Sequence, residues 1–219
     1  MRADAFMTGF RNSDGGRILP ALVKAIRDHK QSLSDIDGAI GDGDHGINMN
    51  KGFMIFSERF AASPGNLSRG LDMLSMTLMT KIGGAMGPLY GFFFKGMAAA
   101  CRNAETINAA VFGNMLSSCR DAIGKISQAK VGDKTLVDVL VPAEEAYRSA
   151  CIDGKTFVGC LDAMISAAVQ GRDATKEMMA KVGRASRLGE RSRGIVDAGA
   201  ASCCLILETM AQSIKAILR

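Results

Sequence analysis

The sequence predicts an all-α fold of seven or eight helices, and three observations favour this class. Apolar residues recur at spacings of three and four along most of the chain, as they do where one face of each helix is buried. Two-residue alternation is confined to two short strand-like fragments, residues 89–94 and 137–141. Clusters rich in glycine separate the periodic segments at intervals of ordinary helix length.

The periodic segments follow one another with clear breaks between them. Their spaced apolar residues are Ile18, Leu22 and Ile26; Met49, Phe53, Phe56 and Phe60; Leu67, Leu71, Leu74 and Leu78; Val111, Met115, Cys119, Ala122 and Ile126; and Leu207, Met210, Ile214 and Ile217. The breaks fall at residues 14–16, 41–46, 63–66, 83–88, 132–133 and 183–199. We expect Pro142 to kink or divide one helix, because proline cannot donate the backbone hydrogen bond.

Length and composition favour one domain that spans residues 1–219, with 47% hydrophobic and 22% charged residues. No uncharged run reaches the roughly 18 apolar residues that a membrane span needs. The first residues, which include Arg2 and Asp4, lack the apolar core of a secretory signal. We therefore expect no secretory signal and no contact with a membrane.

The cysteines and the net charge narrow the functional class further. Six cysteines lack Cys-x-x-Cys spacing, and the adjacent Cys203 and Cys204 are expected to be small buried hydrophobes. This pattern fits a reduced, cytoplasmic compartment. The net charge is +5, but the chain has no tryptophan and only two tyrosines, and neither a stacking platform nor a recognition helix is visible. We expect no nucleic-acid partner.

Residues 36–48 are the most informative stretch. Three carboxylates, those of Asp37, Asp42 and Asp44, lie within eight positions and are interleaved with glycines. Like charges so close together repel one another, and each glycine costs backbone entropy when it is ordered. A divalent cation would offset both costs, because hard cations prefer oxygen ligands. The alternative is a solvated acidic turn.

Three further breaks contain more glycines and charged residues than a simple connection between helices requires. The glycines of residues 83–91 would let backbone N–H groups approach a phosphate at a helix start, although close helix packing explains them equally well. In residues 132–135 we expect Asp133 to be an ordinary N-cap, with Lys134 solvated on the first turn. Residues 183–199 form either an exposed flexible loop or an ordered loop whose arginines embrace phosphate.

Together these segments favour a nucleotide bridged by metal ions. A triphosphate carries about −4, so two divalent cations and three aspartates leave the assembly near −3. A nearby arginine and helix N-termini would offset part of that charge. Phosphoryl transfer depends mainly on positioning and charge stabilisation, which fits a site without an obvious nucleophile.

The motifs and their order resemble the L subunit, or nucleotide-binding domain, of the dihydroxyacetone kinase family over almost the whole chain. The matching residues are Asp37 with 41–46 and 48–50; 83–85 with 87–91; 132–135 with Asp138; and 183–186 with 188–192. The resemblance implies a barrel of eight antiparallel helices, with ADP or ATP and two Mg²⁺ ions at one end.

The resemblance also implies which residues form the site. Asp37, Asp42 and Asp44 would coordinate the two Mg²⁺ ions, and Arg184 would be the catalytic residue. The nucleotide would contact His45, Gly46, Ile47, Asn48, Ala85, Met86, Leu136, Arg184, Asp197, Ala198 and Gly199.

The family resemblance further implies partner proteins. The ketose is held by a separate K subunit, so this chain alone is not expected to phosphorylate dihydroxyacetone. The donor is either free ATP or a phosphotransferase-system protein, the M subunit, which rephosphorylates bound ADP; a stand-alone L chain favours the second mode. The sequence leaves open the preferred ketose and the oligomeric state, including a homodimer.

Several positions depart from the family pattern. Met86 stands where serine is usual, and Ala198 replaces the proline of an Asp-Pro-Gly turn. Phe92 and Ser127 replace a common threonine and a common glycine. These changes spare the metal carboxylates but alter the phosphate contacts. They leave two alternatives open beside the kinase subunit: a nucleotide-sensing regulatory partner without catalysis, or a kinase subunit for another small ketose such as erythrulose.

Overall fold

The computed structural model describes residues 9–219, so residues 1–8, with Arg2 and Asp4, lie outside the described part. The α-helices are α1 (Ile18–Asp28), α2 (Lys30–Ile40), α3 (His45–Ala62), α4 (Leu67–Lys81), α5 (Met86–Cys101), α6 (Ala109–Gly124), α7 (Val137–Ile152), α8 (Phe157–Ala174) and α9 (Ala198–Leu218). Three 3-10 helices are η1 (Asp14–Arg17), η2 (Thr175–Glu177) and η3 (Arg184–Ser192). The prediction of an all-α fold is confirmed.

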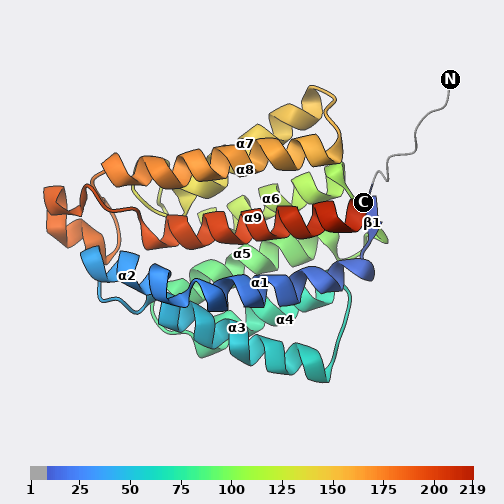
Figure 1. Cartoon of the computed structure of the whole chain (residues 1–219), viewed down its shortest axis with the longest axis horizontal. Helices are drawn as coiled ribbons and strands as arrows, with labels where there is room; N and C mark the ends of the chain where they lie inside the picture. Colours follow the sequence, from blue (N-terminus) through green and yellow to red (C-terminus); the bar gives the residue numbers. More distant parts are fainter. Residues whose placement is uncertain (1–8) are drawn as a thin grey trace.

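Eight of these helices form a closed ring. Going round it, α1 packs on α3, and then α4, α5, α6, α7, α8 and α9 follow before α9 returns to α1. Neighbours in the ring run in opposite directions, so that α3, α5, α7 and α9 all begin at the same end of the molecule (Figure 1). The short helix α2 continues beyond the end of α1 and packs on α3 and α9.

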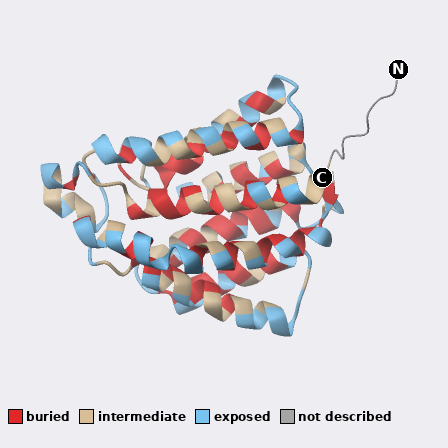
Figure 2. Cartoon of the chain, viewed as in Figure 1, coloured by how far each residue is buried: buried red, intermediate tan, exposed pale blue. Residues whose placement is uncertain are grey.

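Buried apolar side chains from all the helices of the ring form one core, and buried residues, red in Figure 2, recur along these helices. Phe53, Phe93 and Phe94 are fully buried, and Phe94 makes edge-to-face contacts with the other two rings. Cys203 and Cys204 are also buried, as predicted, and burial raises the pKa of the Cys204 thiol to about 12. These thiols therefore act as small core residues.

The structure corrects three expectations about local structure. The strand-like fragments 89–94 and 137–141 lie inside α5 and α7, because short apolar runs in well-buried helices resemble strands in sequence. The strands that form are β1 (Gly9–Arg11) and β2 (Thr106–Asn108), which pair antiparallel. Of the two effects expected of Pro142, a kink or a division, the division is wrong, since α7 continues through Pro142 to Ile152.

Helix α9 is long and apolar enough to span a membrane by length and composition. It carries Glu208 and Lys215, and 44% of its apolar window is buried in the structure, against neighbours that include α1 and α8. Packing between two neighbours of the ring is typical of a core helix.

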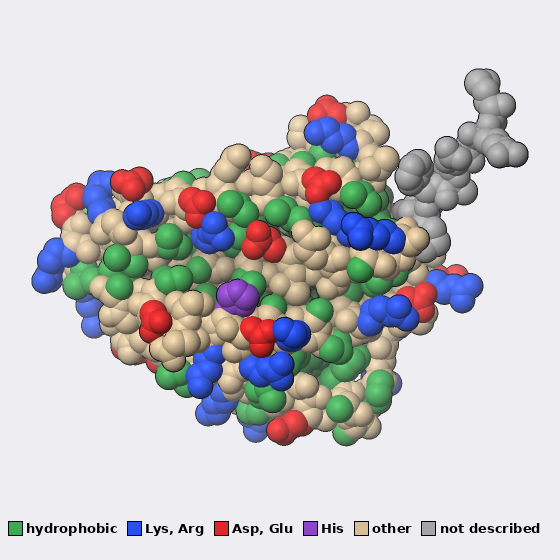
Figure 3. Space-filling view, in the orientation of Figure 1, with side chains coloured by type: hydrophobic (Ala, Val, Ile, Leu, Met, Phe, Trp, Pro, Cys, Tyr) green, Lys and Arg blue, Asp and Glu red, His purple; other side chains and the backbone are tan. Residues whose placement is uncertain are grey.

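On the face drawn in Figure 3, basic and acidic side chains are interspersed over the surface.

Candidate functional site

A cavity of about 560 Å³ opens at the end of the ring where α3, α5, α7 and α9 begin. Its walls bring together segments that are up to about 160 positions apart in the chain. All but two of the predicted site residues line it: Asp37, Asp42, Asp44, His45, Asn48, Ala85, Met86, Leu136, Arg184, Asp197, Ala198 and Gly199.

The three aspartates form one acidic cluster. Asp37 lies in the last turn of α2, and Asp42 and Asp44 lie in the loop before α3. Ligand oxygens of the three carboxylates all lie within 4.8 Å of one another. The loop turns sharply at Gly43, whose φ of +73° is disfavoured for any residue with a Cβ. Asp37 also accepts a hydrogen bond from the amide of His45 at 3.2 Å, which joins α2 to the start of α3.

This donor set fits a hard divalent cation. It offers only oxygen atoms, it is partly open to solvent, and its like charges need a counter-charge. A cation bound by Asp37, Asp42 and Asp44 would lie on the wall of the cavity. In the structure, the guanidinium group of Arg184 forms an ion pair with Asp42 and supplies part of that counter-charge.

The helix ends at the cavity differ from those at the far end of the ring. At the far end, α4, α6 and α8 begin with side-chain caps from Asn66, Asn108 and Thr156. At the cavity, the N-cap residues of α5 and α7, Ala85 and Leu136, provide no side-chain cap. At α7 the Val137 amide instead donates to Thr135 Oγ1 at 3.1 Å. The first N–H groups of α5 have no side-chain acceptor and can donate to a ligand.

The glycine-rich segment that leads into α5 contains glycines in two different surroundings. Gly83 and Gly84 line the cavity, have open space where a Cβ would stand, and Gly84 has a φ of +67°. Gly87 and Gly91 instead allow close packing, because a Cβ there would lie 2.3 Å from the Ile82 carbonyl and 2.1 Å from Met79. The first pair suits a ligand and the second pair suits the helix contact.

A buried hydrogen-bond chain connects three helices behind the cavity. His45 Nε2 lies 2.8 Å from Ser202 Oγ, and Ser202 is also bonded to the Tyr90 hydroxyl. Tyr90 donates to the Gly199 carbonyl at 3.1 Å. Burial lowers the pKa of His45 to about 4, although the charge of Asp37 opposes this shift. His45 is therefore neutral at physiological pH, and its ring is held in a fixed orientation.

The start of α9 forms another wall. Asp197 caps the helix by accepting the Ala200 amide at 2.7 Å, and Ala198 and Gly199 follow it along the cavity. Burial raises the pKa of Asp197 to about 6, while its hydrogen bond from Ala200 and the charge of Lys134 oppose the shift. The replacement of proline by Ala198 leaves the N-cap intact.

The arginine-rich segment is an ordered loop that contains η3. The chain turns at Gly183 and Gly189, both with positive φ, and Arg184 reaches across to the acidic cluster. Ser192, at the end of η3, is fully buried and accepts the Ala180 amide at 2.9 Å. Of the two interpretations of this segment, the ordered loop is the one that the geometry matches.

Two of the residues implied by the family resemblance do not line the cavity. Gly46 faces α2, where its missing side chain allows the Lys30 carbonyl to approach. The side chain of Ile47 is half exposed on the outer surface. Both residues lie in the first turn of α3, where backbone N–H groups lack an intrahelical acceptor. Any contact with a nucleotide there would come from the backbone.

In residues 132–138, the structure contradicts the roles predicted for Asp133 and Lys134. Asp133 is not the N-cap of α7; it accepts the Lys130 amide, while Asp138 accepts the amides of Gly132 and Thr135. Lys134 is not solvated either, since it is 1% exposed and lines the cavity. Lys134 and Tyr90, which line the cavity, and Ser202, which lies behind it, are not among the predicted site residues. A lysine in a glycine-rich turn gives no sequence signal of burial.

The closed ring of antiparallel helices, with an acidic cavity at one end, places the chain in the class of all-helical barrels. Residues 39–212 match the sequence pattern of the family described as the DAK2 domain. The chain belongs to this family.

Named relatives agree with this assignment. The chain is 38% identical to the ADP-binding subunit DhaL of PEP-dependent dihydroxyacetone kinase 1 from Listeria innocua, over 90% of this chain and 94% of that protein. It is 36% identical to the DhaL subunit of the PEP-dependent dihydroxyacetone kinase from Escherichia coli, over 84% and 88% of the two chains.

A solved structure shares the fold. The dihydroxyacetone kinase from C. freundii, in complex with AMP-PNP and Mg²⁺, superposes with a TM-score of 0.66 at 19% identity. The match covers 97% of this chain and 36% of that longer chain.

Proposed function

We propose that this protein is the nucleotide-binding, phosphoryl-transferring subunit of a kinase for dihydroxyacetone or a related small ketose. We further propose that it works as a single domain in the cytoplasm. The observation that carries the proposal is that the acidic cluster and the starts of four helices share one cavity. Such a cavity has separate places for cations and for phosphate groups.

The electrostatics of the helix ends supports this arrangement. Asp37 lies in the last turn of α2 and Asp42 closely follows that helix, whose negative dipole end favours cations. The starts of α3, α5, α7 and α9 carry the positive ends of their dipoles, which favour phosphate oxygens. A magnesium-bound nucleotide presents both charges together.

The roles of the individual residues follow from their positions. Mg²⁺, when bound by the three aspartates, would neutralise charge on the phosphates during transfer. The backbone amides at the start of α5 would orient the phosphate tail. Arg184 would leave Asp42 and donate from its planar guanidinium fork to the transferring phosphoryl group. The buried chain through His45 would hold the start of α3 in place.

The relatives favour a relay. The DhaL proteins are named as ADP-binding subunits of PEP-dependent kinases. By analogy, ADP stays bound to this chain with two Mg²⁺ ions and is rephosphorylated by an M-type phosphotransferase-system protein. The phosphoryl group then passes to a ketose held by a separate K-type subunit.

The direct test has two parts. Mass spectrometry of small molecules released from the freshly purified protein should detect ADP at about one per chain. The protein should then transfer phosphate to dihydroxyacetone only when K-type and M-type subunits are present. An empty site that turns over free ATP would overturn the relay, and a protein that binds no adenine nucleotide would overturn the proposed function.

One observation favours a second candidate function. Met86 presents a thioether to the cavity at the uncapped start of α5, where a hydroxyl could have contacted phosphate. This change favours a non-catalytic, nucleotide-sensing partner protein. Tight binding of ADP without transfer, with active K-type and M-type subunits present, would support this alternative.

A further inference from the structure

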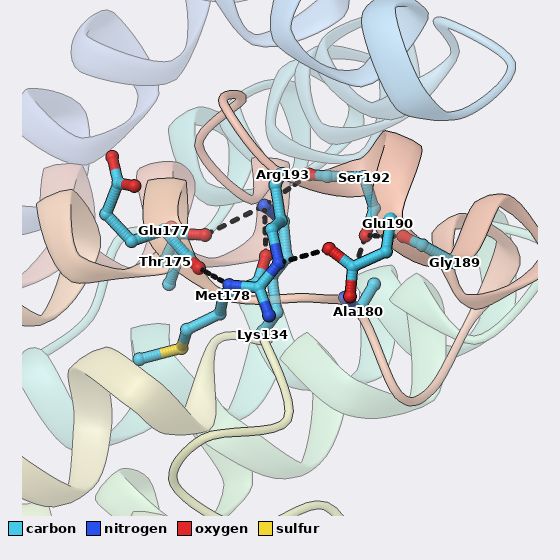
Figure 4. Close-up of polar contacts among 9 residues, drawn as sticks. All are labelled: Lys134, Thr175, Glu177, Met178, Ala180, Gly189, Glu190, Ser192 and Arg193. Atoms are coloured by element: carbon cyan, nitrogen blue, oxygen red, sulfur yellow. Dashed lines mark hydrogen bonds and ion pairs between the residues drawn. The ribbon is translucent and has the colours of Figure 1, made fainter.

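We propose that Lys134 is the positioning residue for the loop that carries Arg184. Its Nζ lies within hydrogen-bond distance of four backbone carbonyls, which share its three N–H donors: those of Thr175 at 2.8 Å, Met178 at 3.2 Å and Ser192 at 2.7 Å (Figure 4), and that of Ile195 at 2.6 Å. None of these partners is a carboxylate. The ammonium group therefore acts as a fixed cation at the centre of a carbonyl cage.

Burying the charged side chain of Lys134 costs free energy. Lys134 is 1% exposed, and an ammonium group without partners would not be tolerated at such a position. Its backbone also has a φ of +63°, which is uncommon for a residue with a side chain. The surrounding contacts must therefore hold Lys134 in place, and such strained positions cluster at functional sites.

The four carbonyls lie on both sides of residues 179–191, the segment that carries Arg184 and is called the arginine loop below. Thr175 and Met178 precede it, whereas Ser192 ends η3 and Ile195 follows η3. A single ammonium group thus ties together the two ends of residues 179–191. Two further bonds close the same base, from Gly194 N–H to the Lys176 carbonyl at 2.8 Å and from Ala180 N–H to Ser192 Oγ at 2.9 Å.

The cage is fixed to the corner that begins α7. The buried carboxylate of Asp138 accepts the amides of Gly132 and Thr135, at 2.5 Å and 2.7 Å, and so fixes the turn on both sides of Lys134. The Lys181 amide also donates to the Asp133 carbonyl at 3.2 Å. The arginine loop is thereby joined to the start of α7, which lines the cavity.

Arg184 is the side chain that depends on this anchor. It is 60% exposed and contacts the acidic cluster only because the closed base directs the loop across the cavity mouth. The Lys134 ammonium group, bonded to four carbonyls, has no contact to offer a phosphate. Lys134 therefore acts through Arg184 and not on the nucleotide itself.

The test is hydrogen exchange together with a double-mutant cycle. In nucleotide-free protein, Lys134→Met should increase amide exchange in residues 179–197 while α3 and α5 stay protected, and Lys134→Gln should do so less. Lys125→Met, at an exposed lysine beyond α6, is the matched control and should leave this region unchanged. Unchanged exchange in residues 179–197, or loss of the whole cooperative fold in both Lys134 variants, would overturn the proposal.

The cycle separates positioning from simple structural support. This part rests on the proposed function, because its readout is release of a fluorescent ADP analogue in Mg²⁺. We expect Lys134→Met to speed release by about tenfold in the natural protein and by less than about twofold in Arg184→Ala protein, since coupled residues are not additive. Equal effects in both backgrounds would overturn the role through Arg184. Failure of the natural protein to bind the analogue would refute the proposed function, whereas the exchange experiment would still test the anchor.

Discussion

The guanidinium group of Arg184 pairs with the carboxylate of Asp42 across the mouth of the cavity, although 142 positions separate them in the chain. Both side chains are largely exposed, so the pair contributes at most about 1 kcal/mol. Such a weak pair can be exchanged for stronger partners. A cation for Asp42 and a phosphate group for Arg184 would satisfy both residues at once.

Arg184→Ala should therefore affect cations and nucleotides in opposite directions. Without nucleotide, Mn²⁺ used as a probe should bind as well as in the natural protein, or up to about fivefold more tightly, because Arg184 no longer competes for Asp42. With Mn²⁺ present, ADP should bind at least about tenfold more weakly, since charge-assisted contacts to phosphate are lost. Titration calorimetry measures both. Weaker binding of Mn²⁺ alone would contradict this account of the ion pair.

Asp42→Asn should abolish Mg²⁺-dependent nucleotide binding and phosphoryl transfer and leave the fold intact. Asp42 is exposed, so the free energy of unfolding should change by less than about 1 kcal/mol. Urea unfolding and a transfer assay with a K-type subunit provide the two measurements. Asp35→Asn, at an exposed aspartate on the neighbouring helix α2, should behave like the natural protein. Undiminished transfer in Asp42→Asn protein would refute its metal role.

The raised pKa of Asp197 predicts that the free energy of unfolding depends on pH. Its pKa in the folded protein is raised to about 6, above the value of 3.8 expected when unfolded, so its ionisation costs stability at neutral pH. This cost disappears as the pH falls through 6 towards 4. Asp197→Asn keeps the N-cap, so it should raise the free energy of unfolding at pH 8 by about 1–2 kcal/mol. The gain should shrink by pH 4.5, and a gain that grows on acidification would contradict the sign.

The hydrogen-bond chain behind the cavity should be important for stability. Ser202→Ala leaves the ring of His45 without its partner and removes one contact of Tyr90. An unsatisfied buried polar group should cost about 1–3 kcal/mol in urea unfolding. Ser213→Ala, at a partly buried serine on the same helix, should change stability by less than about 0.5 kcal/mol. Equal effects of the two substitutions would show that the chain contributes nothing.

Gly46 should not tolerate any side chain. A Cβ there would lie 1.9 Å from the Lys30 carbonyl, so Gly46→Ala must push α2 and α3 apart. We expect a loss of about 3 kcal/mol or more, measured by thermal or urea unfolding. Gly124→Ala is the matched control, because no atom lies within 4 Å of a Cβ at this last residue of α6. The control should be neutral or slightly stabilising.

The sequence predicts the helices well because each one buries a continuous apolar face. The spacing of Phe53, Phe56 and their neighbours places α3 correctly, and the same holds for α1, α4, α6 and α9. The pattern fails for residues 89–94 and 137–141, where the apolar faces are broad enough to obscure the helical period. Pro142 is similarly misleading, since α7 accommodates it without ending.

Only part of the candidate site can be predicted from the sequence. Clustered aspartates and glycines are visible in sequence because their composition is unusual, so the acidic cluster and the glycine-rich start of α5 could be predicted. Lys134 could not, because its burial depends on carbonyls that lie 41 to 61 positions away. Ser202 is equally hidden, since its partners are on α3 and α5. Long-range polar contacts of this kind leave no local pattern.

The central claim is that Asp37, Asp42 and Asp44 bind Mg²⁺ beneath the phosphates of an adenine nucleotide. Anomalous diffraction from crystals of the protein with ADP and Mn²⁺ tests it most directly. The account predicts two anomalous peaks bridging these carboxylates and the diphosphate, with metal–oxygen distances of about 2.0–2.3 Å. Bound ADP whose phosphates lie away from the three carboxylates, with no anomalous peak beside them, would contradict it.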